Sequence, residues 1–95
     1  MNKFDLISID KAAELAQQPG YLVVDLRSRE EYDENHIENA VNIENINMSK
    51  VNQFNRKDLI WVLYCRRGSL SFRFASEMAD YGYKVMAVVG GFRTR

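Results

Sequence analysis

The sequence predicts an α/β fold in which a parallel sheet carries helices on both faces. Residues 21–26 and 59–64 are almost continuously apolar, which is typical of strands buried on both faces of a sheet. Apolar residues recur at helical spacing over 70–79, so a long amphipathic helix is predicted there. Strand and helix patterns alternate along the chain, and helical crossovers of this kind connect parallel strands.

The length and composition indicate one small folded domain over residues 1–95. A chain of 95 residues seldom holds two independent cores, and 46% hydrophobic with 12% aromatic residues excludes a disordered or fibrous protein. The 13 basic and 13 acidic residues cancel, so bulk charge gives no argument for a nucleic-acid partner. No apolar run approaches the roughly 20 residues that cross a bilayer, and no membrane span is expected.

Two helices are predicted in the first third of the chain, and each begins at a serine. Ser8 is suited to cap a helix that the Pro-Gly pair at 19–20 ends. Ser28 and Glu31 stand three positions apart and form the pattern of a capping box, which predicts a short helix to about Asn35.

The remaining elements are read from weaker patterns. A strand is predicted over 40–43, and a short helix over 48–54 inside a polar stretch. Gly82 stands where a left-handed residue ends the long helix, and a last strand is predicted over 84–89.

Chemistry-bearing residues follow three of the predicted strands. In open α/β sheets, binding sites form at the carboxyl ends of the strands. Asp25 and Arg27, Cys65, and the glycines at 90–91 each fall at or just after such an end. We therefore expect these three segments to converge at one edge of the sheet.

The loop over 65–71, which joins the strongest strand to the strongest helix, carries the predicted nucleophile. Unpaired N–H groups and the helix dipole make a helix start attractive to anions, and a short loop there can curl into an anion cradle. Cys65 at the first position of that cradle is favoured as a thiolate. Arg66 and Arg67 add positive charge, and Gly68 allows a turn that a Cβ atom would obstruct.

A simpler interpretation of the same residues stays open. A lone cysteine is often an inert buried residue, and arginines in a loop are often solvated charges. One cysteine cannot form an intramolecular disulfide, and no Cys/His pair has the spacing of metal ligands. The first residues contain no apolar signal core, so we expect a cytoplasmic protein in which a free thiol persists.

Several stretches of the chain resemble the signature motifs of rhodanese-like domains, the single-domain sulfurtransferases. They occur in the family's order and spacing and cover essentially the whole chain. The matching stretches are Val23-Val24-Asp25-Leu26-Arg27 with Glu31-Tyr32, His36-Ile37-Glu38-Asn39-Ala40-Val41-Asn42-Ile43, Cys65-Arg66-Arg67-Gly68-Ser69-Leu70-Ser71 and Gly90-Gly91-Phe92.

This resemblance implies a five-stranded parallel sheet and a sulfur-transfer reaction that needs no metal and no cofactor. Cys65 would take the outer sulfur of a small anionic donor such as thiosulfate and hold it as a persulfide. It would then pass that sulfur to cyanide, a small thiol or a protein thiol. The residues implied to bind the persulfide and the donor are Arg66, Arg67, Gly68, Ser69, Leu70 and Ser71.

Other matching positions are implied to be structural. Asp25 and Arg27 would form a pair that steadies the loop from the neighbouring strand end. Histidine side chains often serve as catalytic acids or bases, but the residue that corresponds to His36 in the family holds the fold together. The glycines at 90–91 would let the backbone pass close to the cysteine loop.

The chain departs from the family pattern at two places. Asn39 stands where the family usually has glycine, and asparagine tolerates the left-handed backbone that such a turn needs. The chain ends at Arg95, without the tryptophan and final helix that are common after the glycine pair. We therefore expect Phe92 to be less well covered than in the family, or available to a partner.

The sequence bears on three alternatives to sulfur transfer. The second-ranked function is a non-catalytic or partner-dependent interaction module on the same fold. It ranks below catalysis because domains that lose the chemistry usually lose the cysteine, and Cys65 is present. A cysteine phosphatase or arsenate reductase would need arginine six residues after the cysteine, where this chain has Ser71. A thioredoxin-type oxidoreductase would need a second cysteine.

Overall fold

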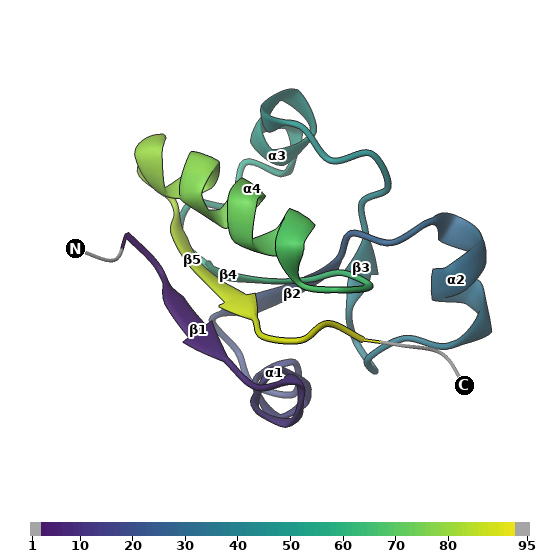
Figure 1. Cartoon of the computed structure of the whole chain (residues 1–95). Coiled ribbons are helices and arrows are strands. Elements are labelled where there is room, and N and C mark those ends of the chain that lie inside the picture. Colours follow the sequence, from purple (N-terminus) through teal and green to yellow (C-terminus); the bar gives the residue numbers. More distant parts are fainter. Residues whose placement is uncertain (1–2, 93–95) are drawn as a thin grey trace.

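The computed structural model describes residues 3–92, which form a five-stranded, all-parallel sheet with helices on both faces (Figure 1). In chain order the elements are β1 (Asp5–Ile7), α1 (Ile9–Leu15), β2 (Tyr21–Asp25), α2 (Arg29–Glu34), β3 (Val41–Asn42), α3 (Met48–Phe54), β4 (Ile60–Tyr64), α4 (Ser69–Asp80) and β5 (Lys84–Val88). The strand order is β1-β5-β4-β2-β3, with β4 at the centre. The predicted α/β class, the five strands and the two-sided helix cover are confirmed.

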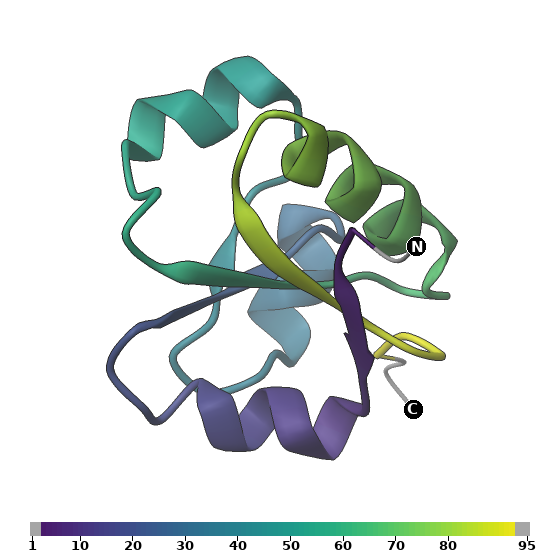
Figure 2. The same ribbon diagram turned by 90° about the vertical axis from the view of Figure 1, so that its left-hand side faces the viewer.

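The register of the central strands decides where the loops meet. Asp25 at the end of β2 lies opposite Tyr64 at the end of β4, and Leu63 of β4 lies opposite Ala87 of β5. The carboxyl ends of the three strands therefore lie side by side at the same end of the sheet, as the sequence predicts. The view in Figure 2 shows the strands between α1 on one side and α3 with α4 on the other.

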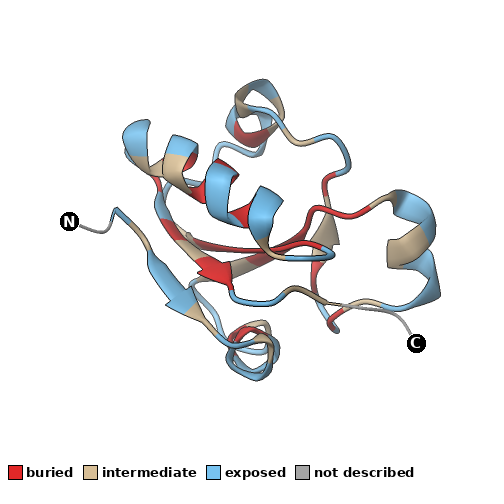
Figure 3. Cartoon of the chain, in the orientation of Figure 1, coloured by how far each residue is buried: buried red, intermediate tan, exposed pale blue. Residues whose placement is uncertain are grey.

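Each face of the sheet has its own hydrophobic core. Burial is concentrated in the strands and on the side of α4 that faces them (Figure 3). The core on the α3 and α4 side contains Val24, Leu26, Ile43, Val51, Trp61, Leu63, Cys65, Phe74, Ala75, Met78, Tyr83, Val85 and Ala87. The core on the α1 side contains Ala12, Leu15, Val23, Ile37, Ala40, Val62, Tyr64 and Val88.

Local signals in the sequence fix the helix ends. The side chains of Ser8, Ser28 and Asn47 accept hydrogen bonds from the N–H groups of Lys11, Glu31 and Lys50, at 3.0, 3.1 and 2.9 Å. Gly82 adopts a φ of +88° just beyond α4, which confirms the predicted left-handed stop. Asn39 has a φ of +75°, so asparagine does take the left-handed conformation at the position where glycine is usual.

The strand β1 was not predicted, and the strand predicted over 40–43 is half as long as expected. Residues 5–7 are exposed or half-buried and pair only with β5, because β1 lies at an edge of the sheet. An edge strand of this length shows no apolar run in the sequence. The strand predicted over 40–43 is reduced to the two residues of β3, at the opposite edge.

None of the helices within residues 3–92 combines the length and the apolar character needed to cross a membrane. The longest of them, α4, has 12 residues and is exposed along one side. The end of the chain at Arg95 lies outside the described residues.

The central strand offers a direct test of the fold. Leu63 of β4 is fully buried, whereas Leu6 of β1 is 52% exposed. We expect Leu63→Ala to lower the free energy of unfolding by about 2–5 kcal/mol, because it removes buried methyl groups and leaves a cavity. The matched variant Leu6→Ala should change it by less than about 1 kcal/mol. Urea unfolding measures both, and equal losses would contradict the strand order.

Candidate active site

Cys65 lies at the end of the central strand, in the loop that leads into α4. The turn is made possible by Gly68, which caps α4 with a φ of +93° and lies against the segment after β5. A Cβ atom at Gly68 would lie 3.3 Å from the backbone nitrogen of Gly90. The positive φ favours glycine at this position, and a side chain there would also crowd the backbone of Gly90.

Backbone N–H groups of this loop point at the cysteine sulfur. Sγ of Cys65 accepts hydrogen bonds from the N–H of Gly68 at 3.1 Å and from the N–H of Ser71 at 3.4 Å. Oγ of Ser71 lies 3.5 Å from the same sulfur and donates to the carbonyl of Gly68 at 3.0 Å. The sulfur thus sits in the anion cradle that the sequence predicts at the start of this helix.

The same contacts favour the ionised form of the thiol. Burial on its own raises the pKa of Cys65, because a charge is poorly solvated inside the protein. The interaction with the Ser71 hydroxyl and the N–H groups of Ser71, Arg67 and Gly68 together lower it by more. The pKa of the Cys65 thiol is therefore below its ordinary value, and Arg67 contributes through its backbone.

The thiol is shielded from bulk water but faces a pocket. Cys65 is only 4% exposed, yet it lines a cavity of about 230 Å³. The other residues around this cavity are Leu26, Arg27, Glu31, Arg66, Arg67, Ser69 and Leu70. A small molecule could therefore approach the sulfur from this cavity, which we call the Cys65 pocket.

A buried ion pair supports one wall of the Cys65 pocket. The guanidinium of Arg27 lies 2.8 Å from the carboxylate of Asp25, and the two side chains are 1% and 0% exposed. Burial lowers the pKa of Arg27, but the hydrogen bond and charge of Asp25 outweigh it, so the pKa is raised. The guanidinium also lies 4.7 Å from the ring centroid of Phe92. Phe92 is half-buried, and its ring also packs 5.5 Å from that of Tyr64.

The second glycine of the pair at 90–91 passes directly against the cysteine loop. A Cβ atom at Gly91 would lie 2.4 Å from the carbonyl oxygen of Arg66, so a side chain there would displace the loop. The next residue, Phe92, donates its N–H to the carbonyl of Cys65 at 2.8 Å. The close backbone approach expected from the sequence is confirmed for Gly91. At Gly90 a Cβ atom would meet open space, and only the φ of +81° favours glycine.

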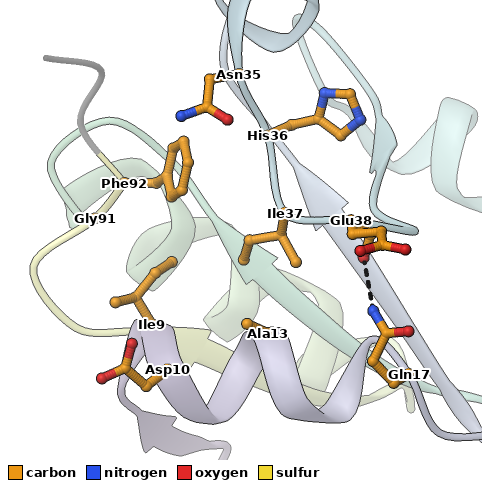
Figure 4. Close-up of a pocket in the computed structure, with 10 residues that line it drawn as sticks. All are labelled: Ile9, Asp10, Ala13, Gln17, Asn35, His36, Ile37, Glu38, Gly91 and Phe92. Carbon is orange, nitrogen blue, oxygen red and sulfur yellow. Dashed lines mark hydrogen bonds between the residues drawn. The ribbon is translucent and has the colours of Figure 1, made fainter.

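His36 lies at a different cavity from Cys65. Figure 4 shows this second cavity, of about 500 Å³, between α1 and residues 35–38, with Phe92 at one end. His36 stacks on the ring of Tyr32 with a centroid separation of 3.7 Å, and its Nδ1 lies 2.6 Å from the Tyr32 carbonyl. These contacts fit the structural role that the family resemblance implies for His36.

The structure brings the predicted site residues together and adds others. Cys65, Gly68 and Ser71 are in direct contact, and the arginines of the loop line the pocket with Ser69 and Leu70. Asp25 lies behind Arg27. Sequence reasoning did not place Glu31 or Leu26 in this pocket. In the sequence, the only role indicated for Glu31 is that of a capping residue, and Leu26 is predicted only as the last residue of a buried strand.

Within residues 3–92, no group of three or more His, Cys, Asp and Glu side chains is arranged to hold a metal ion. The groups that the Cys65 loop offers to a ligand are one sulfur atom and backbone N–H groups. Such N–H groups favour an anion in the cradle.

The rhodanese-like domain model matches residues 8–94 of this chain. The chain belongs to the rhodanese-like family. That family is one of sulfurtransferases, and the name of the relative from Tolumonas auensis agrees with it.

Two curated proteins and one solved structure illustrate the likeness. The thiosulfate sulfurtransferase GlpE of Tolumonas auensis is 30% identical over 93 residues, which are 97% of this chain and 88% of that protein. A probable molybdopterin-synthase adenylyltransferase of Porphyra purpurea is 36% identical over 73 residues, which are 75% of this chain and 19% of that protein. The crystal structure of a rhodanese-like domain protein from Staphylococcus aureus matches with a TM-score of 0.73 at 24% identity, over 93% of this chain and 87% of that one.

The cradle predicts how the thiol titrates. Ser71→Ala removes the hydroxyl that lies 3.5 Å from Sγ and should raise the pKa of Cys65. The rate of alkylation by iodoacetamide, followed against pH, should rise at lower pH in the wild type than in the variant, since only the thiolate reacts. The matched variant Ser69→Ala, two positions away, should leave the midpoint unchanged. A wild-type midpoint at or above that of a free thiol would contradict this account.

The buried pair predicts a large and partner-dependent loss of stability. Arg27→Met leaves the Asp25 carboxylate buried without its partner and should cost about 3–5 kcal/mol of unfolding free energy. Arg29→Met breaks an exposed pair with Asp33 and should cost less than about 1 kcal/mol. The double variant Asp25→Asn with Arg27→Met should lose less than the sum of the two single losses. Additive losses in urea unfolding would show that the two side chains act independently.

Proposed function

We propose that this chain moves a sulfane sulfur from a small anionic donor such as thiosulfate to a thiophilic acceptor, through a persulfide on Cys65. The observation that carries the proposal is the cradle of N–H groups around the Cys65 sulfur, 3.1 and 3.4 Å away, at the end of a pocket. Membership of the rhodanese-like family and the name of the Tolumonas auensis relative support the same reaction class. The domain would span residues 1–95.

In the first step the Cys65 thiolate attacks the outer sulfur of thiosulfate. A bond forms between Sγ and that sulfur, the sulfur–sulfur bond of the donor breaks, and sulfite leaves with the electron pair. The lowered pKa of Cys65 increases the fraction of the attacking thiolate at a given pH. Arg66 and Arg67, on the pocket wall, would attract the doubly charged donor.

In the second step the acceptor attacks the terminal sulfur of the persulfide. The sulfur–sulfur bond on the enzyme breaks, and its electron pair returns to Cys65 as a thiolate. A thiol of lowered pKa is a better leaving group, so the contacts that assist the first step also assist the second. Two displacements on one sulfur predict ping-pong kinetics without a metal or an organic cofactor.

The loop would hold the persulfide by the same groups that hold the thiolate. Its N–H groups over 66–71 would bind the negative charge of the terminal sulfur, and the Ser71 hydroxyl could turn from the Gly68 carbonyl to donate one more bond. Asp25 and Arg27 would act as positioning residues, because Asp25 fixes the guanidinium of Arg27, which lines the pocket.

A second candidate is a partner-dependent module that carries sulfur for another protein. The relative from Porphyra purpurea favours it, because the stretch similar to this chain covers 19% of a much larger protein. On this account the acceptor is a protein thiol and cyanide is a poor substitute. Both candidates place the chain in a reducing compartment such as the cytoplasm, where a free thiol persists.

The intact mass after treatment with thiosulfate tests the proposal. The wild-type protein should become one sulfur atom heavier, and cyanide should remove that atom as thiocyanate. Cys65→Ser should show neither change, because the chain has a single cysteine. A variant that still gains sulfur, or a wild type that gains none, would refute the proposal. Faster discharge to protein thiols than to cyanide would favour the second candidate.

A further inference from the structure

The Cys65 pocket holds one acidic side chain beside its arginines, and that side chain bears on which acceptor the pocket takes. Glu31 reaches the pocket from the first turn of α2. The inference drawn from it rests on the proposed function and concerns the second, sulfur-releasing step.

The Glu31 carboxylate is held in place on one side and only loosely paired on the other. Its Oε1 accepts a hydrogen bond from the Ser28 hydroxyl at 3.2 Å, which anchors the side chain at the start of α2. Its Oε2 lies 3.6 Å from Nε of Arg66, well beyond the distance of a charge-assisted hydrogen bond. The Arg66 side chain is 68% exposed and the Glu31 side chain 30%. The carboxylate therefore stays available to a second cation.

The charges that line the pocket let the Glu31 carboxylate influence which acceptor binds. Asp25 neutralises Arg27, so the unbalanced charges that line the pocket are those of Arg66, Arg67 and Glu31. Once Cys65 carries a persulfide, the negative charge of the terminal sulfur would interact with the N–H groups of the cradle and with Arg66 and Arg67. An anionic acceptor in this cavity would then be repelled by the Glu31 carboxylate, whereas an ammonium group would be attracted to it.

The remaining walls suit a short carbon chain. Leu26 and Leu70 line the same cavity, and its volume of about 230 Å³ exceeds what a lone anion such as cyanide fills. We propose that Glu31 sets the charge selectivity of the Cys65 pocket, and that the acceptor class it favours is a small thiol carrying an ammonium group. The ammonium would lie beside the Glu31 carboxylate while the thiolate faces the persulfide.

The reaction is the second displacement already described, with an aminothiol as nucleophile. The acceptor thiol loses its proton to solvent, and its sulfur bonds to the terminal sulfur of the persulfide. The enzyme's sulfur–sulfur bond breaks, its electron pair stays on Cys65, and the acceptor leaves as its own persulfide. The ammonium group and Glu31 keep their charges throughout.

A single-turnover discharge with three small thiols tests the inference. The protein is loaded with thiosulfate, freed of donor, and mixed with cysteamine, 2-mercaptoethanol or mercaptoacetate, which carry positive, zero and negative charge. Loss of the extra sulfur is followed by intact mass. For each thiol the rate of Glu31→Gln is divided by the wild-type rate, so that the thiol's own reactivity cancels. Glutamine keeps the capping box and removes only the charge.

Glu31→Gln should slow discharge to cysteamine by about three- to tenfold and speed discharge to mercaptoacetate by a similar factor, because one charge at close range is removed from a part-exposed site. The rate with 2-mercaptoethanol should stay within about twofold. Raising the salt concentration should shrink both effects. The control Glu30→Gln, an exposed acid in the same helical turn that does not line the pocket, should leave all three ratios near one.

Equal ratios for the three thiols, or the same pattern in Glu30→Gln, would overturn the inference. These outcomes are distinct from failure of the proposed function, which shows earlier as a wild-type protein that does not load sulfur.

Discussion

Backbone N–H groups that point at one sulfur atom are the interaction on which the rest of this structure depends. A buried thiol in apolar surroundings would be protonated and inert, and Cys65 is buried at 4% exposure. The N–H groups of Gly68 and Ser71 reverse that tendency, because they offer the sulfur the hydrogen bonds that water would otherwise supply. Shielding from water then strengthens the cradle, since charge and dipole interact more strongly where the dielectric is low.

Neighbouring segments of the chain hold the cysteine loop in the geometry that forms the cradle. Gly91 passes so close to the carbonyl of Arg66 that only a residue without a side chain fits, and Phe92 ties its N–H to the carbonyl of Cys65. The ring of Phe92 in turn lies near the guanidinium of Arg27, which Asp25 fixes. The segments from β2, through the ion pair, to the residues after β5 therefore brace the cysteine loop and one wall of the Cys65 pocket.

The parts of this structure that depend on local pattern could be predicted from the sequence, and those that depend on docking between elements could not. Ser28 predicts the start of its helix and Gly68 predicts its turn, because each residue acts on neighbours within a few positions along the chain. The strand at 5–7 is exposed and held by one neighbour, so nothing in its own sequence marks it. Glu31 shows its capping role in the sequence, but its place at the pocket follows from how α2 sits beside the loop after β4.

The most direct measurement of the central claim is an NMR titration of the backbone N–H groups around Cys65. The N–H signals of Gly68 and Ser71 should move together with pH, with one midpoint below that of an ordinary cysteine thiol, and should stop moving in Cys65→Ala. The N–H of Lys11, which is bonded to the Ser8 hydroxyl and lies outside the Cys65 pocket, serves as the internal reference. Signals from Gly68 and Ser71 that ignore the ionisation of the thiol, or that report a midpoint at or above the ordinary value, would contradict the account.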